Sequence, residues 1–188
     1  QAELLSAWLG AHGRTVVRTR EPGGTDLGRL VREIVLHHRG HIAPRAEALL
    51  YAADRAHHID TVVRPAIARG AVVIQDRYLD SSVAYQGAGR VLDADEVRSL
   101  SLWATDGLLP DLTVLLDIDP GTARSRLDAD DKPFDRLEAE KADFHERVRA
   151  AFRSLADAEP ERFLVLDAAE PPDRLADRVR EVVASRLG

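Results

Sequence analysis

The stretch "GAVVIQDRYLDSSVAYQGAGR" (residues 70–90) joins a short apolar run to a group of polar side chains. The run "AVVI" is continuous and rich in β-branched residues, which is typical of a strand buried on both faces of a parallel sheet. An acid, an arginine, two serines, a tyrosine and a glutamine follow it closely. Ligands of open α/β sheets bind beyond the carboxyl ends of the strands. The stretch therefore predicts a buried strand with a binding site at its end.

Three further apolar runs of this kind alternate with helical patterns along the chain. The predicted strands are 14–19, 70–76, 112–119 and 162–168. The predicted helices are 2–12, 26–38 capped by Asp26, 44–69 kinked or divided at Pro65, 93–105, one from Pro120, one ending near Ala158, and 171–187. The residues after the second strand, 77–90, are expected to be a loop. This alternation predicts an α/β fold, a three-layer α/β/α domain with a parallel sheet, over residues 1–188.

The composition excludes several classes of protein. The chain has 188 residues, 45% of them hydrophobic, with a formal net charge of −6 and no cysteine. The absence of cysteine rules out disulfides and thiolate metal sites and fits a cytoplasmic protein. No apolar stretch is long enough to span a membrane, and the acidic balance argues against a broad nucleic-acid-binding surface. A local cluster of arginines that grips a phosphate remains compatible with this charge.

The front of the chain departs from the usual α/β order. It begins with a helical pattern and contains no methionine, whereas a chain of this class normally starts with a strand. The loop before the first helix is where a glycine-rich turn would cradle phosphates, and no GxxxxGKS/T pattern occurs in residues 1–188. We therefore expect a strand and a glycine-rich phosphate loop to precede Gln1.

Four segments together resemble bacterial-type thymidylate kinases, in the right order and across nearly the whole chain. They are "TREPGGT" (19–25), "ALLYAADR" (48–55), "QDRYLDSSVAYQG" (75–87) and "DRLEAE" (135–140). The resemblance implies a P-loop kinase fold, a homodimer, and the transfer of a phosphoryl group from Mg²⁺-ATP to dTMP. Without the phosphate loop, a chain of residues 1–188 is predicted to be inactive. A catalytically inactive nucleotide-binding relic and a kinase for another nucleoside or nucleoside monophosphate are the alternatives.

The resemblance assigns the acceptor phosphate to Arg77, whose planar guanidinium can bind phosphate oxygens bidentately. Asp76 would join the Mg²⁺ shell or orient Arg77, although a purely structural acid is an open alternative. Tyr51 and Arg55 are four residues apart and hence on one helical face. There the tyrosine ring would stack on thymine and the arginine would donate to a base carbonyl.

The loop after Arg77 matches the family's segment for the base and sugar. Ser81, Ser82 and Gln86 could read the edge of thymine, and the Tyr85 ring would leave no room for a ribose 2′-hydroxyl. One of the two serines could instead cap a following helix. Glu21 and Arg32 match positions that line the monophosphate and sugar pocket, with a solvent-exposed surface position as the alternative for Arg32.

The segment 124–140, "RSRLDADDKPFDRLEAE", resembles the family's lid over ATP. Arg126 and Arg136 are the candidates for stabilising the transferred phosphoryl group, Arg126 also for binding ATP, and Glu138 for binding Mg²⁺. This lid carries Asp128, Asp130 and Asp131, where the family often has arginines. The histidines in "LHHRGH" (36–41) and "AHHI" (56–59) are interpreted as solvated residues near helix ends rather than metal ligands.

Overall fold

Two pairs of parallel strands form the centre of the structure, a computed structural model that describes residues 1–129 and 133–187. Strand β1 (Val16–Arg20) pairs with β2 (Val72–Asp76), with Val16 opposite Val72. Strand β3 (Thr113–Asp117) pairs with β4 (Phe163–Asp167), with Thr113 opposite Phe163. Both pairs run parallel, so a helical crossover separates the strands of each pair. The lid residues Asp130 and Asp131 lie outside the described residues.

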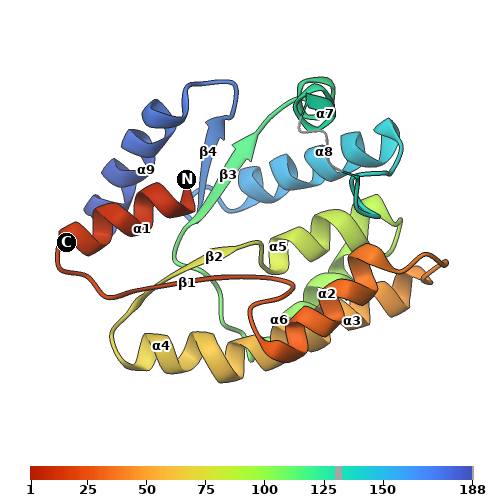
Figure 1. Cartoon of the computed structure of the whole chain (residues 1–188), viewed down its shortest axis with the longest axis horizontal. Coiled ribbons are helices and arrows are strands. Elements are labelled where there is room, and N and C mark those ends of the chain that lie inside the picture. The colour runs from red at the N-terminus through yellow and green to blue at the C-terminus, as the bar shows by residue number, and fades with distance from the viewer. Residues whose placement is uncertain (130–132, 188) are drawn as a thin grey trace.

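The predicted α/β class and the four predicted strands are confirmed, but the strands do not form one sheet within the described residues. β1–β2 and β3–β4 are separate two-stranded sheets, and Figure 1 shows them running in different directions. An apolar run specifies that a strand is buried, while its hydrogen-bonded neighbour depends on long-range pairing. The sequence pattern therefore predicted the strands but could not define their grouping.

Helices cover the strand pairs on both sides (Figure 1). Helix α1 (Ala2–Ala11) packs against β1, β2 and α9 (Pro172–Leu187), whereas α2 (Asp26–His37), α3 (Pro44–His58) and α6 (Ala94–Ala104) pack together on the other side of the β1–β2 pair. The remaining helices are η1 (Ile59–Val63), α4 (Arg64–Ala68), α5 (Leu79–Ser82), η2 (Val83–Gly89), α7 (Pro120–Ala129) and α8 (Ala142–Ala158). Within the described ranges, no helix is long and apolar enough to cross a membrane.

The helix ends agree with the predicted boundaries, with one correction. Asp93 caps α6 by accepting a hydrogen bond from the Glu96 amide at 2.9 Å, and Pro120 begins α7. Asp26 is not the cap of α2, because Thr25 Oγ1 accepts from the Gly28 amide at 2.9 Å instead. The predicted long helix is divided into α3, η1 and α4, and Pro65 lies in the first turn of α4.

Residues 77–90 are mostly helical, so the prediction of a loop was wrong. After Arg77 and the extended Tyr78 they form α5 and the π-helical segment η2. Ala84 packs in a buried cluster with Phe144 and Val148 of α8. This tertiary packing overrides the weak helix propensity of a stretch that ends in Gly-Ala-Gly. The helix holds the polar side chains of this stretch at defined angles beside α3 and α6.

Candidate active site

Arg77 follows the last residue of β2 in an unusual backbone conformation. Its φ is 64°, in the left-handed region that side chains other than glycine rarely adopt. The Arg77 guanidinium carbon lies 4.9 Å from the centre of the Tyr85 ring. Strained backbone of this kind occurs preferentially at functional sites. The structure thus brings together two predicted substrate-binding residues, both at the carboxyl end of β2.

Arg55 and Glu21 form a buried ion pair, with Arg55 Nε 2.7 Å from Glu21 Oε2. The other two guanidinium nitrogens of Arg55 donate to Ser101 Oγ at 3.1 Å and Ser82 Oγ at 3.2 Å. Three predicted site residues, Glu21, Arg55 and Ser82, are therefore in contact. All three Arg55 nitrogens bind protein groups in this arrangement, and its contact with a base stays a prediction.

His58 completes this buried cluster. Its Nδ1 lies 2.9 Å from Glu21 Oε1, and its Nε2 lies 2.6 Å from Thr19 Oγ1. A side chain at Gly24 would meet the His58 ring, because a Cβ there would be 2.6 Å from Nε2. The interpretation of this histidine as solvated was wrong, since it is fully buried. Among the described residues, no group of three or more histidines and acids could hold a metal ion.

Asp54, next to Arg55, is buried without a hydrogen-bond partner for either carboxylate oxygen. Burial raises the pKa of this carboxyl, and the negative charge of Glu21 raises it further. The sequence does not single out this residue, because a buried acid on a helix has the same local pattern as an exposed one.

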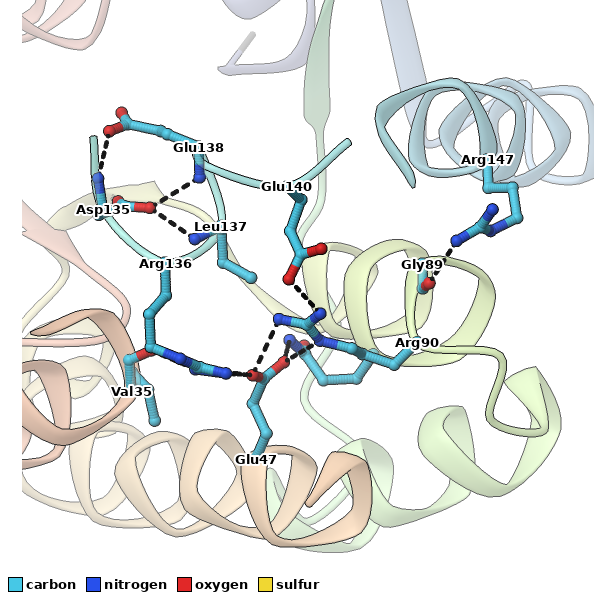
Figure 2. Close-up of polar contacts among 11 residues, drawn as sticks. Val35, Glu47, Gly89, Arg90, Asp135, Arg136, Leu137, Glu138, Glu140 and Arg147 are labelled. Atoms are coloured by element: carbon cyan, nitrogen blue, oxygen red, sulfur yellow. Dashed lines mark hydrogen bonds and ion pairs between the residues drawn. The ribbon is translucent and has the colours of Figure 1, made fainter. Parts of the chain in front are cut away.

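Glu47, which no motif in the sequence indicated, is the centre of a second buried cluster (Figure 2). Its carboxylate accepts from Gln86 Nε2 at 3.0 Å, from Arg90 Nε at 3.1 Å, and from both terminal nitrogens of Arg136 at 2.9 Å. Arg90 also pairs with Glu140. Gln86 and Arg136, which the resemblance assigned to the base and to the phosphoryl group, thus both bind Glu47 here.

Tyr51 lies on α3 between the two buried clusters, one helical turn from Glu47 and one from Arg55. Its ring packs against Val31 and Val35 of α2. Burial, and then the charge of Glu47, raises the pKa of its phenol above the ordinary value. The ring therefore stays neutral at physiological pH, which suits a stacking surface.

The remaining predicted residues are more dispersed. Arg32 Nη1 donates to the Pro22 carbonyl at 3.2 Å and so braces the turn after β1. Arg126, exposed on α7, donates to the Ala168 carbonyl at 3.1 Å, beyond the end of β4. Ser81 is half-buried on α5. Their contacts with substrate stay predictions.

The two carboxylates predicted for Mg²⁺ differ in their exposure and in their contacts. Asp76 is exposed at the end of β2, and no described residue forms a hydrogen bond with its carboxylate. Glu138 Oε2 instead accepts from the Asp135 amide at 2.9 Å, within its own turn. Proteins often hold Mg²⁺ with only one or two carboxylates plus substrate phosphates. A carboxylate that accepts one hydrogen bond keeps lone pairs for a cation, so the roles of Asp76 and Glu138 in binding Mg²⁺ both stay predictions.

A parallel α/β scaffold with an arginine, aromatic rings and hydroxyl groups at a strand end is the architecture of a nucleotide-binding protein. The chain belongs to the thymidylate kinase family, whose sequence model matches residues 1–179. It is 73% identical over 180 residues to the thymidylate kinase of Clavibacter sepedonicus, covering 96% of this chain and 85% of that protein. It is 71% identical, with the same coverage, to that of Leifsonia xyli subsp. xyli. It is 50% identical to that of Cutibacterium acnes, over 100% of this chain and 90% of that protein. The predicted resemblance is confirmed.

Proposed function

We propose that this protein transfers the terminal phosphoryl group of Mg²⁺-ATP to dTMP and forms dTDP. The observation that carries the proposal is the placement of Arg77 at the end of β2 against the Tyr85 ring, in a chain of the thymidylate kinase family. Such a reaction needs positioning and charge stabilisation rather than covalent chemistry. The side chains found at this strand end supply those two functions.

Arg77 binds the acceptor phosphate in this proposal. A guanidinium can hold two phosphate oxygens at once, which fixes the direction of the attacking oxygen. The strained backbone of Arg77 and the Tyr85 ring orient the guanidinium before substrate arrives. The Tyr85 ring lies beside the same phosphate and excludes a 2′-hydroxyl from the sugar.

The thymine base lies on Tyr51, next to the buried Arg55 cluster. The ring supplies a flat apolar surface, and Glu21, which pairs with Arg55, fixes the position of the guanidinium. Ser81, Ser82 and Gln86 present hydroxyl and amide groups from α5 and η2. Polar groups arranged in this way reject bases that cannot pair with them.

Mg²⁺, when bound, would neutralise negative charge on the ATP phosphates. Asp76 and Glu138 are the residues that would hold it. Arg126 is the candidate of segment 124–140 for binding ATP, whereas Arg136 is held by Glu47. The segment would exclude water from the reaction as a lid.

We also propose a cytoplasmic homodimer. Four apolar side chains are exposed on α2 and α3: Leu27 (45%), Leu30 (65%), Ile34 (45%) and Leu49 (57%). Several exposed apolar side chains on neighbouring helices are typical of a protein interface. Sedimentation of the protein would detect this dimer, and replacement of Leu30 with Glu is expected to dissociate it.

The test of the function is release of ADP from Mg²⁺-ATP with dTMP, dUMP, dCMP, AMP or no acceptor. We expect turnover with dTMP, weaker turnover with dUMP and none above background with the others. Preference for another monophosphate would identify a kinase of different specificity and would overturn the proposed substrate.

A further inference from the structure

Glu47 joins three parts of the chain at one buried carboxylate. The carboxylate belongs to α3. Gln86 lies in η2 and Arg90 directly after it, whereas Arg136 lies in segment 124–140 (Figure 2). Glu47 is 0% exposed. A charge buried this deeply is tolerated only when well-placed partners bind it. The positions of the three parts are therefore mutually dependent.

The contact with segment 124–140 extends beyond this ion pair. Arg136 Nη1 donates to the Val35 carbonyl at 2.8 Å, and the Arg136 amide donates to the Leu36 carbonyl at 3.1 Å. The neighbouring Leu137 packs against the cluster that contains Tyr51 and also against the cluster that contains Ala84. The docked end of this segment thus touches both sides of the proposed dTMP pocket.

Glu47, Tyr51 and Arg55 occupy successive turns of one face of α3. Because a helix is a rigid element that can carry coupling between sites, a displacement of α3 at Glu47 would also displace Tyr51. We propose that Glu47 is a positioning residue through which dTMP binding and the docking of Arg136 stabilise each other. This inference rests on the proposed function, because it takes dTMP as the ligand beside Tyr51. Two events coupled in this way change each other's equilibrium by the same factor.

The chain offers a matched control in Glu159. This carboxylate also binds two arginines, with distances of 3.1 Å to Arg98 Nη2 and 2.7 Å to Arg162 Nε. It joins α6 to the residues before β4 through arginines other than those that bind Glu47, and its side chain is 27% exposed. If Glu47 had only a structural role, its substitution should change dTMP binding and trypsin cleavage no more than the substitution of Glu159 does.

The experiment compares the full chain with its Glu47→Gln and Glu159→Gln variants. Calorimetry measures the dissociation constant of dTMP, and limited trypsin digestion measures cleavage between residues 124 and 140 with and without dTMP. For the full chain we expect dTMP to slow this cleavage. For Glu47→Gln we expect about tenfold weaker dTMP binding and loss of the protection. Glu159→Gln should retain both properties.

Arg136→Met tests the same contact from its less buried side, in case Glu47→Gln folds poorly. We expect it to lose dTMP affinity as Glu47→Gln does, and the double variant to lose no more than either. Because Arg136→Met removes one trypsin site, digestion of these variants is compared only at Arg124 and Arg126. Unchanged dTMP binding in correctly folded Arg136→Met or Glu47→Gln would overturn the coupling alone. If the full chain without substitutions does not bind dTMP, the proposed substrate is overturned as well.

Discussion

Buried charge is concentrated on one face of α3, where Glu47, Asp54, Arg55 and His58 are each at most 1% exposed. Glu47, Arg55 and His58 have ionic or hydrogen-bonding partners. Asp54 has none in the described part of the chain. A buried unpaired carboxylate destabilises the folded state when it is ionised. The face that is proposed to hold the base therefore contains a residue that lowers the stability of the fold.

Asp54→Asn should change the pH dependence of stability. The raised pKa of Asp54 means that the folded state binds the proton more tightly than the unfolded chain, whose pKa is near 3.8. The cost of ionisation is absent below the unfolded pKa, grows as pH rises through the window up to the folded pKa, and is complete above it. The free energy of unfolding of Asp54→Asn, relative to the natural chain, should rise across that window, by about 1.4 kcal/mol per unit of pKa difference.

Urea unfolding followed by circular dichroism from pH 3.5 to 8 measures this difference. The exposed Asp60 in η1 provides the control, since Asp60→Asn makes the same change of side chain at a position in contact with water. If the free energy of unfolding of Asp54→Asn differed from that of the natural chain by the same amount at every pH, the pKa of Asp54 would not be raised by folding.

The sequence predicted the shared helical face of Tyr51 and Arg55, but not the contacts that Glu47 and His58 make with distant residues. The spacing of Tyr51 and Arg55 predicted their common face, and the same spacing extends back to Glu47. What makes Glu47 central is its contact with Arg136, and no local period in a single sequence reports a contact between such distant residues. The His58 prediction failed in the same way, because its partners Thr19 and Glu21 lie in another element.

At the scale of the element, segment η2 shows how packing selects local structure. Its residues include turn formers, yet it is helical because Ala84 and Gly89 lie directly against α8. The carbonyls of Ala88 and Gly89 accept hydrogen bonds from the Arg147 guanidinium at 3.2 and 3.0 Å. These contacts fix the helix that carries Tyr85 and Gln86.

Gly89→Ala should destabilise the protein and weaken dTMP binding. A Cβ at Gly89 would lie 2.6 Å from Phe144 Cε2 and 3.1 Å from Val148 Cγ2. Relief of this overlap requires η2 or α8 to shift, which costs about 1–3 kcal/mol and displaces Tyr85. Thermal unfolding and dTMP calorimetry would measure both effects.

Gly10→Ala in α1 is the matched control for that substitution. A Cβ there meets nothing within 4 Å, so the better helix propensity of alanine should stabilise the protein by about 0.5–1 kcal/mol. Equal stability of the two alanine variants would show that η2 and α8 are not tightly packed.

At the scale of the whole molecule, the two strand pairs carry different parts of the proposed site. The β1–β2 pair carries Glu21, Asp76 and Arg77 at its carboxyl end, so the contacts proposed for dTMP come from this pair and the helices around it. The β3–β4 pair ends near α7, where Arg126 contacts the Ala168 carbonyl. Apart from α5 and η2, element types and order could be predicted from apolar periodicity, whereas the division into two strand pairs reflects strand pairing over long distances in the sequence.

A polypeptide of residues 1–188 alone should bind dTMP weakly and release no ADP from Mg²⁺-ATP. The residues proposed to contact dTMP all lie within this range, but the range contains no GxxxxGKS/T phosphate loop. Backbone amides of such a loop hold the ATP phosphates in line with the acceptor, and without them the reaction loses the positioning on which it depends. Calorimetry with dTMP and a coupled ADP assay would be applied to this polypeptide and to one extended at its N-terminus by a strand and a phosphate loop. We expect turnover only from the extended chain.

ADP release by the 188-residue polypeptide would mean that other residues, with the exposed Arg126 as the first candidate, bind the ATP phosphates.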